Sequence, residues 1–213
     1  MAGEFVHTLG DLSQLPGLLN GKFLKGHAHP RIAMVGRSNV GKSSLINALL
    51  KFRQARVSNQ PGKTRQIHFY LWKEIAKIVA DLPGYGYARA GHEERERWGD
   101  FINGYLRADE GLERALVLLD SRHGPTEMDV EAIKFLSFES IPVTFVFTKV
   151  DQLKTQKERA ARKKEASSAL LELGYDPQYA FWVSIEDERS LKALAAELAQ
   201  NKLQGLTRVE SDE

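Results

Sequence analysis

Residues 36–43, GRSNVGKS, have the types and spacing needed to bind phosphate groups. They fit the pattern G-x-x-x-x-G-K-[ST], in which glycines let the backbone wrap around phosphates with its N–H groups turned inward. The helix expected to begin near Lys42 adds the positive end of its dipole, the lysine adds a point charge, and the serine hydroxyl suits Mg²⁺. The pattern predicts a nucleoside triphosphate and leaves the base and the reaction open. The expected site consists of Gly36, Arg37, Ser38, Asn39, Val40, Gly41, Lys42 and Ser43.

A second motif, DLPG at residues 81–84, follows the apolar run that ends at Asp81. Alone, such a tetrapeptide is typical of an ordinary turn. In a chain with a phosphate loop, an aspartate at a strand end suits the Mg²⁺ side of a triphosphate site, and a glycine amide suits the γ-phosphate. Such a segment can become ordered when the γ-phosphate is present and relax when it leaves. We therefore expect Asp81, Leu82, Pro83 and Gly84 to take part in binding.

A third motif, TKVD at residues 148–151, ends another apolar run and predicts the base. A carboxylate can accept two hydrogen bonds from the ring N–H and the amine of guanine, and adenine has no such donor pair. Each charged hydrogen bond lost costs about 1.5–3 kcal/mol, so the carboxylate favours GTP over ATP. A last strand end offers Ser184 and the Ile185 amide to the guanine carbonyl. The expected base site consists of Thr148, Lys149, Val150, Asp151, Val183, Ser184 and Ile185.

Alternating strand-like and helix-like segments must position these motifs. Strands are expected at 31–36, 67–72, 74–81, 115–120, 143–148 and 179–184, and helices at 42–51, 93–107, 127–139, 154–173 and 189–202. Most strands are continuous apolar runs, as in parallel sheets covered on both faces. The pair 67–72 and 74–81 alternates instead, which predicts an antiparallel hairpin at one sheet edge. The fold class is therefore α/β with a mainly parallel, doubly wound sheet, whose ligands bind at the carboxyl ends of the strands.

The segments GRSNVGKSSLINALL, PGKTRQIHFY, DLPGYGYA, SRHGPTEMD and TKVD together closely resemble the EngB (YihA/YsxC) family of bacterial ribosome-biogenesis GTPases. The resemblance covers residues 28–203. It implies a Ras-like P-loop GTPase fold of about six strands with one antiparallel edge strand and helices on both faces. It further implies GTP and GDP binding, Mg²⁺, GTP hydrolysis, and a role in large ribosomal subunit assembly that is linked to cell division and septation.

The resemblance also assigns roles to residues. It makes Thr64 the switch threonine, which reaches Mg²⁺ only in the triphosphate state, and adds Ser43 and Asp81 as metal ligands. The neighbouring residues expected to contact the nucleotide are Gly62, Lys63, Arg65 and Gln66. The residues expected to serve the reaction are Lys42, Thr64 and Asn39.

Hydrolysis is expected to be slow without a partner. Tyr85 occupies the position of the glutamine that orients the attacking water in many GTPases. Asn39 could help hold an activating K⁺ ion or could make only local loop hydrogen bonds, and both alternatives stay open. Thr148 replaces the asparagine usual in GTPases, and Ile185 replaces a small residue.

Composition limits the remaining possibilities. The 213 residues suffice for one sizeable domain, and the absence of cysteine excludes disulfides, cysteine metal sites and thiol catalysis. The net charge of +2 is too small to indicate nucleic-acid binding by itself. Near the switches, basic residues are interleaved with aromatic ones: Arg53, Arg56, Lys63, Arg65, Arg89, Arg95, Arg97, Tyr85, Tyr87 and Trp98. Such a charge pattern is typical of a solvated face, and RNA contact is the alternative, which the family resemblance supports.

We expect an irregular N-terminal extension at 1–27, a GTPase domain at 28–203 and a flexible acidic tail at 204–213. A cytoplasmic monomer that contacts the large ribosomal subunit, through rRNA and ribosomal proteins, and no membrane is the favoured interpretation. A small-molecule phosphotransferase would leave the TKVD segment unexplained. A membrane-recruited signalling GTPase lacks a lipidation motif.

Overall fold

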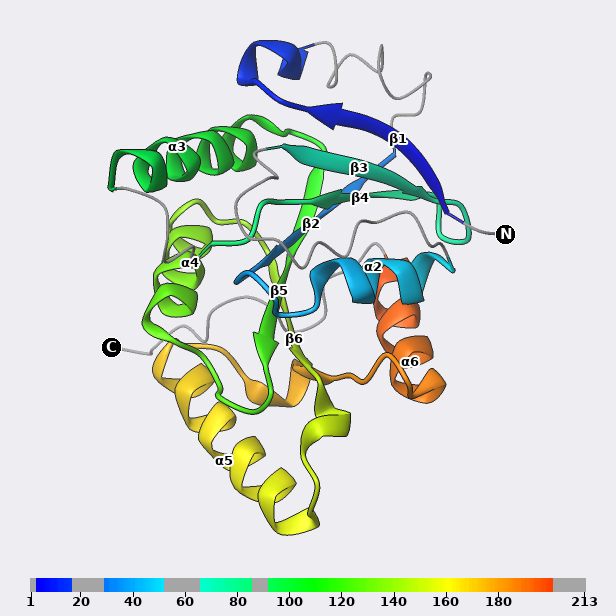
Figure 1. The fold of residues 1–213 in the computed structure, drawn as a ribbon, viewed down its shortest axis with the longest axis vertical. Helices are drawn as coiled ribbons and strands as arrows, with labels where there is room; N and C mark the ends of the chain where they lie inside the picture. Colours follow the sequence, from blue (N-terminus) through cyan, green and yellow to red (C-terminus); the bar gives the residue numbers. More distant parts are fainter. Residues whose placement is uncertain (1–2, 17–28, 52–65, 86–91, 201–213) are drawn as a thin grey trace. The chain divides into compact units, whose positions relative to one another are not determined.

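A computed structural model describes residues 3–16, 29–51, 66–85 and 92–200 of the chain, and only the backbone of 92–98. The chain divides into two compact units, Met1–Arg114 and Ala115–Glu213, and each is described by itself. Seven strands lie in the described residues (Figure 1). The expected α/β class, with mainly parallel strands, an antiparallel edge and flanking helices, is confirmed.

The first unit contains four strands in the order β1-β3-β4-β2. Their bounds are β1 (Glu4–Leu9), β2 (Arg31–Gly36), β3 (Ile67–Trp72) and β4 (Lys77–Asp81). β2 and β4 are parallel, whereas β3 is antiparallel to both β4 and β1. Helix α2 (Lys42–Leu50) buries Leu45, Ile46 and Leu49 and packs on β2 and β4. Helix α3 (His92–Ala108) contacts the short helix η1 (Leu12–Gln14).

Three expectations for this unit are wrong. Residues 4–9 are not irregular, because they form β1, whose Leu9 is fully buried and whose Thr8 hydroxyl lies 2.8 Å from Nδ1 of His68. The edge strand is therefore β1, not the 67–72 strand, which lies between β1 and β4 (Figure 1). The second strand of the hairpin begins at Lys77 instead of residue 74, because the turn before it includes Ala76 in the left-handed conformation (φ +53°).

A buried ion pair ties the start of β2 to the segment after α3. Nε of Arg31 donates to both carboxylate oxygens of Asp109, at 2.6 and 2.7 Å, and the Tyr105 hydroxyl donates to the same carboxylate at 2.7 Å. The arginine and aspartate side chains are 6% and 0% exposed. Burial and the nearby carboxylate raise the pKa of Tyr105 well above its usual value. A Cβ at Gly111 would lie 2.0 Å from Nη2 of Arg31, so a larger residue there would displace the guanidinium from this pair.

The second unit contains parallel strands in the order β5-β6-β7. Their bounds are β5 (Leu112–Asp120), which begins in the first unit, β6 (Val143–Thr148) and β7 (Phe181–Trp182). The helices are α4 (Glu127–Phe138), α5 (Gln156–Glu172) and α6 (Glu188–Ala199), with short helices η2 (Val150–Gln152) and η3 (Pro177–Tyr179). β7 is shorter than the expected 179–184, since η3 includes Tyr179 and the strand ends at Trp182.

Local sequence explains where these helices begin and end. Thr126 begins α4 in a capping box, in which its N–H donates to the Asp129 carboxylate at 2.8 Å. Gly174, at φ +83°, follows the end of α5 in the left-handed conformation that favours glycine. Strands β5 and β6 end together, because Asp120 pairs with Thr148. That shared end positions the polar residues that follow.

The buried ion pair predicts a large stability effect. Asp109→Asn leaves the Arg31 charge buried without a carboxylate, so the free energy of unfolding should fall by about 3 kcal/mol or more in urea denaturation followed by circular dichroism. The control is Glu74→Gln, which breaks an ion pair whose Lys51 side chain is 71% exposed and should cost less than about 1 kcal/mol. Equal small losses in the two variants would contradict the importance given to burial.

Candidate functional site

The phosphate-loop segment joins β2 directly to α2. β2 ends at Gly36 and α2 begins at Lys42. Between them, Asn39 (φ +63°) and Gly41 (φ +106°) adopt left-handed conformations, which turn the chain sharply before the helix. Nζ of Lys42 donates to the carbonyl oxygens of Gly36 at 2.9 Å and Arg37 at 3.2 Å. The loop thus closes around its own lysine, the side chain expected to meet the outer phosphates.

Asp81 at the end of β4 lies beside this loop. β4 pairs with β2 so that Asp81 is opposite Met34, two residues before the loop begins. Burial raises the pKa of Asp81 to about 6, although the Lys42 charge and a hydrogen bond with Ser43 act in the opposite direction. Burial likewise lowers the pKa of Lys42, against the effect of the Asp81 charge. The two charged groups are therefore desolvated and stabilise each other only in part.

The donor set fits a hard divalent cation. Ser43 and Asp81 bring a hydroxyl and a carboxylate oxygen together, and Mg²⁺ prefers oxygen ligands with few protein contacts and phosphates completing its shell. A carboxylate whose pKa burial raises can accommodate further positive charge. In the described parts of the chain, no group of three or more His, Cys, Asp or Glu residues could hold a metal ion by itself. Two protein oxygens leave most of the coordination shell of such a cation to other ligands.

The segment after Asp81 packs on the phosphate loop. The Ser38 N–H donates to the Tyr85 carbonyl at 3.0 Å, and Tyr85 forms an isolated parallel bridge with Arg37. The Ser38 hydroxyl lies 3.4 Å from the Gly84 carbonyl oxygen. A Cβ at Gly84 would lie 2.8 Å from both Nζ of Lys42 and the Ser38 nitrogen. Only glycine allows this approach, because the Ser38 backbone cannot move aside as a flexible side chain could.

In the second unit, the TKVD segment and the 183–185 segment meet. The Ser184 hydroxyl donates to the Asp151 carboxylate at 2.8 Å and accepts from the Glu186 N–H at 3.1 Å. The Val150 N–H donates to the Val183 carbonyl at 3.4 Å. Ser184 is buried, whereas the Ile185 side chain is 51% exposed. The segments are thus joined through a serine–carboxylate contact, and the isoleucine side chain lies at the surface.

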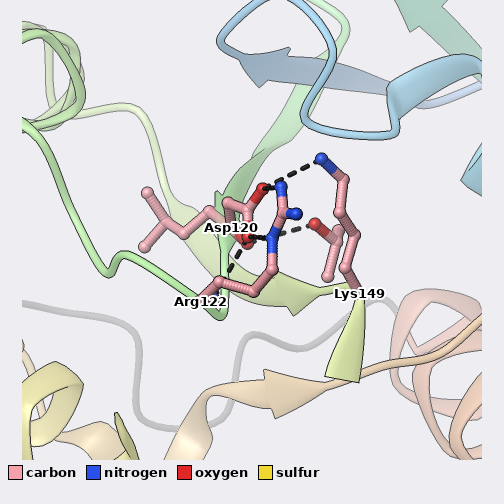
Figure 2. Close-up of polar contacts among 5 residues, drawn as sticks. Asp120, Arg122 and Lys149 are labelled. Carbon is pink, nitrogen blue, oxygen red and sulfur yellow. Dashed lines mark hydrogen bonds and ion pairs between the residues drawn. The ribbon is translucent and has the colours of Figure 1, made fainter. Parts of the chain in front are cut away.

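Thr148 and Lys149 complete this segment. The Thr148 hydroxyl donates to the Leu119 carbonyl at 3.2 Å, across the β5–β6 pair. Lys149 follows in the left-handed conformation (φ +60°) and precedes η2. Its Nζ lies 2.9 Å from Oδ2 of Asp120, the last residue of β5 (Figure 2).

Asp120 and Arg122 are polar residues of this region that were not among the expected site residues. The Arg122 guanidinium binds the Asp120 carboxylate through two hydrogen bonds of 2.8 and 2.7 Å (Figure 2). The position of Asp120 could have indicated it, since it is a carboxylate at the end of a buried apolar strand, like Asp81. Arg122 lies in the SRHGPTEMD segment, whose residues were given no role in the site.

Several expected site residues lie outside the described residues. These are Gly62, Lys63, Thr64 and Arg65, together with Arg53, Arg56, Tyr87 and Arg89 of the basic and aromatic set. Gln66 is exposed just before β3, and Arg95, Arg97 and Trp98 lie in the part of α3 described by its backbone alone. No helix in the described ranges has the length and apolar character needed to span a membrane.

Comparison with known proteins gives consistent results. Residues 31–149 match the model of a family described as 50S ribosome-binding GTPase. The chain is 45% identical to a probable GTP-binding protein EngB of Desulfovibrio desulfuricans, over 67% of this chain and 71% of that protein. It is 46% identical to the EngB protein of Ligilactobacillus salivarius, over 63% and 71% of the two chains.

Solved structures agree with the fold. A crystal structure of a probable GTP-binding protein EngB superposes with a TM-score of 0.60 and 25% identity, covering 78% of this chain and 95% of that one. A variant of Era from Aquifex aeolicus bound to GDP and aluminium fluoride gives a TM-score of 0.64 at 22% identity, over 85% and 60% of the two chains. The second likeness concerns the fold alone.

The close approach of Gly84 predicts a functional effect. In Gly84→Ala, the added methyl group must push residues 84–85 away from Ser38, so turnover of GTP should fall roughly 10- to 100-fold, as expected for a misplaced catalytic segment. Phosphate release under saturating GTP measures this. Gly99→Ala is the matched control, since a Cβ there meets nothing within 4 Å. Equal turnover in the two variants would show that the approach has no role.

Proposed function

We propose that this chain, which belongs to the family of 50S ribosome-binding GTPases and to its EngB-type GTP-binding proteins, is a nucleotide-operated switch in large ribosomal subunit assembly. In this proposal, the rate of GTP hydrolysis sets how long the GTP-bound state of the switch persists. The observation that carries the proposal is the packing of Gly84 and Tyr85 on the phosphate loop. A segment that touches the triphosphate site through its backbone can change conformation when the γ-phosphate arrives or leaves.

Binding of GTP would rearrange the phosphate loop. Lys42 would exchange the carbonyl oxygens of Gly36 and Arg37 for the outer phosphates, and the loop N–H groups from Asn39 onward would surround them. Ser43 and Asp81, with Thr64, would hold Mg²⁺. Bound there, the ion would neutralise charge that develops between the β- and γ-phosphates. The Gly84 N–H would be close to the γ-phosphate because the residue packs against Ser38.

Base recognition would rest on Asp151 and its neighbours. The carboxylate accepts a hydrogen bond from the Ser184 hydroxyl. Because a carboxylate can accept several hydrogen bonds, it can also accept those from the ring N–H and the amine of guanine. Adenine would present a lone pair there. This supports GTP and GDP as the ligands, and disfavours a small-molecule phosphotransferase that uses the phosphate loop alone.

Hydrolysis is proposed to be slow without a partner, because Tyr85 has no side-chain amide with which to orient water. The backbone carbonyl of Tyr85 accepts a hydrogen bond from the Ser38 N–H. A ribosomal partner, or a K⁺ ion held with the help of Asn39, would supply the missing charge stabilisation. Equal turnover in K⁺ and Na⁺ buffers would exclude the role of the ion. The remaining parts of the proposal are a cytoplasmic monomer, contact with rRNA, and an effect on division and septation that follows from ribosome supply.

The proposed base site predicts a change of specificity. Asp151→Asn removes the carboxylate that guanine needs and offers an amide N–H to the carbonyl that xanthine has in place of the guanine amine. Affinity for GDP should fall by at least about 100-fold, and xanthosine diphosphate should become the preferred ligand. Competition with a fluorescent nucleotide measures both. Asp176→Asn, which alters the half-buried carboxylate at the N-cap of η3, is the control and should change neither. Unaltered guanine preference in Asp151→Asn would contradict the assignment.

The switch predicts nucleotide-dependent binding to the ribosome. Co-sedimentation with purified large ribosomal subunits should be strong with a non-hydrolysable GTP analogue and weak with GDP or without nucleotide. The Asp151→Asn variant provides an internal control, because it should need the xanthosine analogue for the same binding. Equal binding under all conditions would contradict the switch while leaving GTP binding intact.

A further inference from the structure

The Asp120 carboxylate at the end of β5 binds two cationic side chains. Oδ2 accepts from Nζ of Lys149 at 2.9 Å, and both oxygens accept from the Arg122 guanidinium at 2.8 and 2.7 Å (Figure 2). The aspartate is 3% exposed, whereas the Lys149 and Arg122 side chains are 22% and 38% exposed. A nearly buried carboxylate thus holds two side chains that extend toward solvent.

Lys149 needs an external restraint. Its backbone lies in the left-handed region, which is unfavourable for a residue with a side chain and persists where surrounding contacts fix it. Lysine has four rotatable side-chain bonds, and holding such a stem in one direction loses rotamer entropy. The hydroxyl of the preceding Thr148 donates to the Leu119 carbonyl. Unlike asparagine, threonine has no side-chain amide that could hold the loop. The ion pair with Asp120 is a contact that fixes the far end of the lysine.

We propose that Asp120 is a positioning residue for guanine nucleotides, which holds the Lys149 stem in place to cover one face of the base. The inference rests on the proposed function, since it presumes that residues 148–151 receive guanine. Asp120 touches neither base nor phosphate in this scheme. It acts through the lysine and compensates for the asparagine that Thr148 replaces.

The charge state of Asp120 is consistent with this role. Burial alone would raise the pKa of this carboxyl, but hydrogen bonds from Arg122 and Lys149 outweigh it and hold the pKa well below the usual range. Asp120 therefore stays ionised under physiological conditions. Arg122 binds both carboxylate oxygens, and Lys149 binds Oδ2 directly, so replacing the arginine should leave the contact with Lys149 in place.

The test compares Asp120→Asn with Lys149→Met, which keeps the apolar stem and removes the ammonium. Each variant should weaken binding of GDP and of a GTP analogue by the same factor, about tenfold, because a base contact does not sense the γ-phosphate. The KM for GTP should rise while kcat at saturation stays the same. The double variant should lose no more than either single variant, since the two residues would act through one contact.

Two further variants separate positioning from damage to the fold. Arg122→Gln should leave nucleotide affinity unchanged, and Asp120→Glu, which keeps the charge, should recover part of the affinity lost in Asp120→Asn. Circular dichroism without nucleotide verifies folding. The inference is overturned if Asp120→Asn binds GDP like the wild type, if losses in the double variant add, or if Arg122→Gln loses as much. Failure of the wild-type protein to bind guanine nucleotides would instead defeat the proposed function.

Discussion

The parallel pairing of β2 with β4 is the constraint on which the phosphate half of the site depends. It sets Asp81 opposite Met34, so that the carboxylate lies beside the loop that begins two residues later. Lys42 and Asp81 are then desolvated together, and burial acts against both charges. The charges of Lys42 and Asp81 compensate each other only in part, beside a glycine-containing loop. A phosphate and a divalent cation bound there would complete the charge balance.

The same strand-end geometry recurs in the second unit with different chemistry. β5 and β6 end in register at Asp120 and Thr148, so the carboxylate of one strand meets the lysine that follows the other. Ser184 adds a hydroxyl from the segment after β7 to the Asp151 carboxylate. In each unit a carboxylate after an apolar strand binds a cation or a hydroxyl supplied by a neighbouring segment. This recurrence follows from parallel strands, because their carboxyl ends lie at the same edge.

Sequence patterns predicted the elements that are determined by residues close together in the chain. The phosphate loop between an apolar strand and a helix depends on nearby residues, and so do the bounds of α4 and α5, which were expected within a few residues of those observed. β1 was missed because its stability comes from pairing with β3 and from the burial of Leu9, which no local pattern indicates. The Asp120 cluster was missed for a related reason. Its partners are set by strand register, 29 residues away in the case of Lys149.

The position of β1 at the sheet edge has a consequence for the newly made chain. Thr8 meets His68 across 60 residues of sequence, so the first strand has no hydrogen-bonding neighbour until β3 has been synthesised. β2 is paired later still, because its partner β4 ends at Asp81. Because long loops close slowly, strand pairing in this unit would follow the formation of helix α2, whose hydrogen bonds are local.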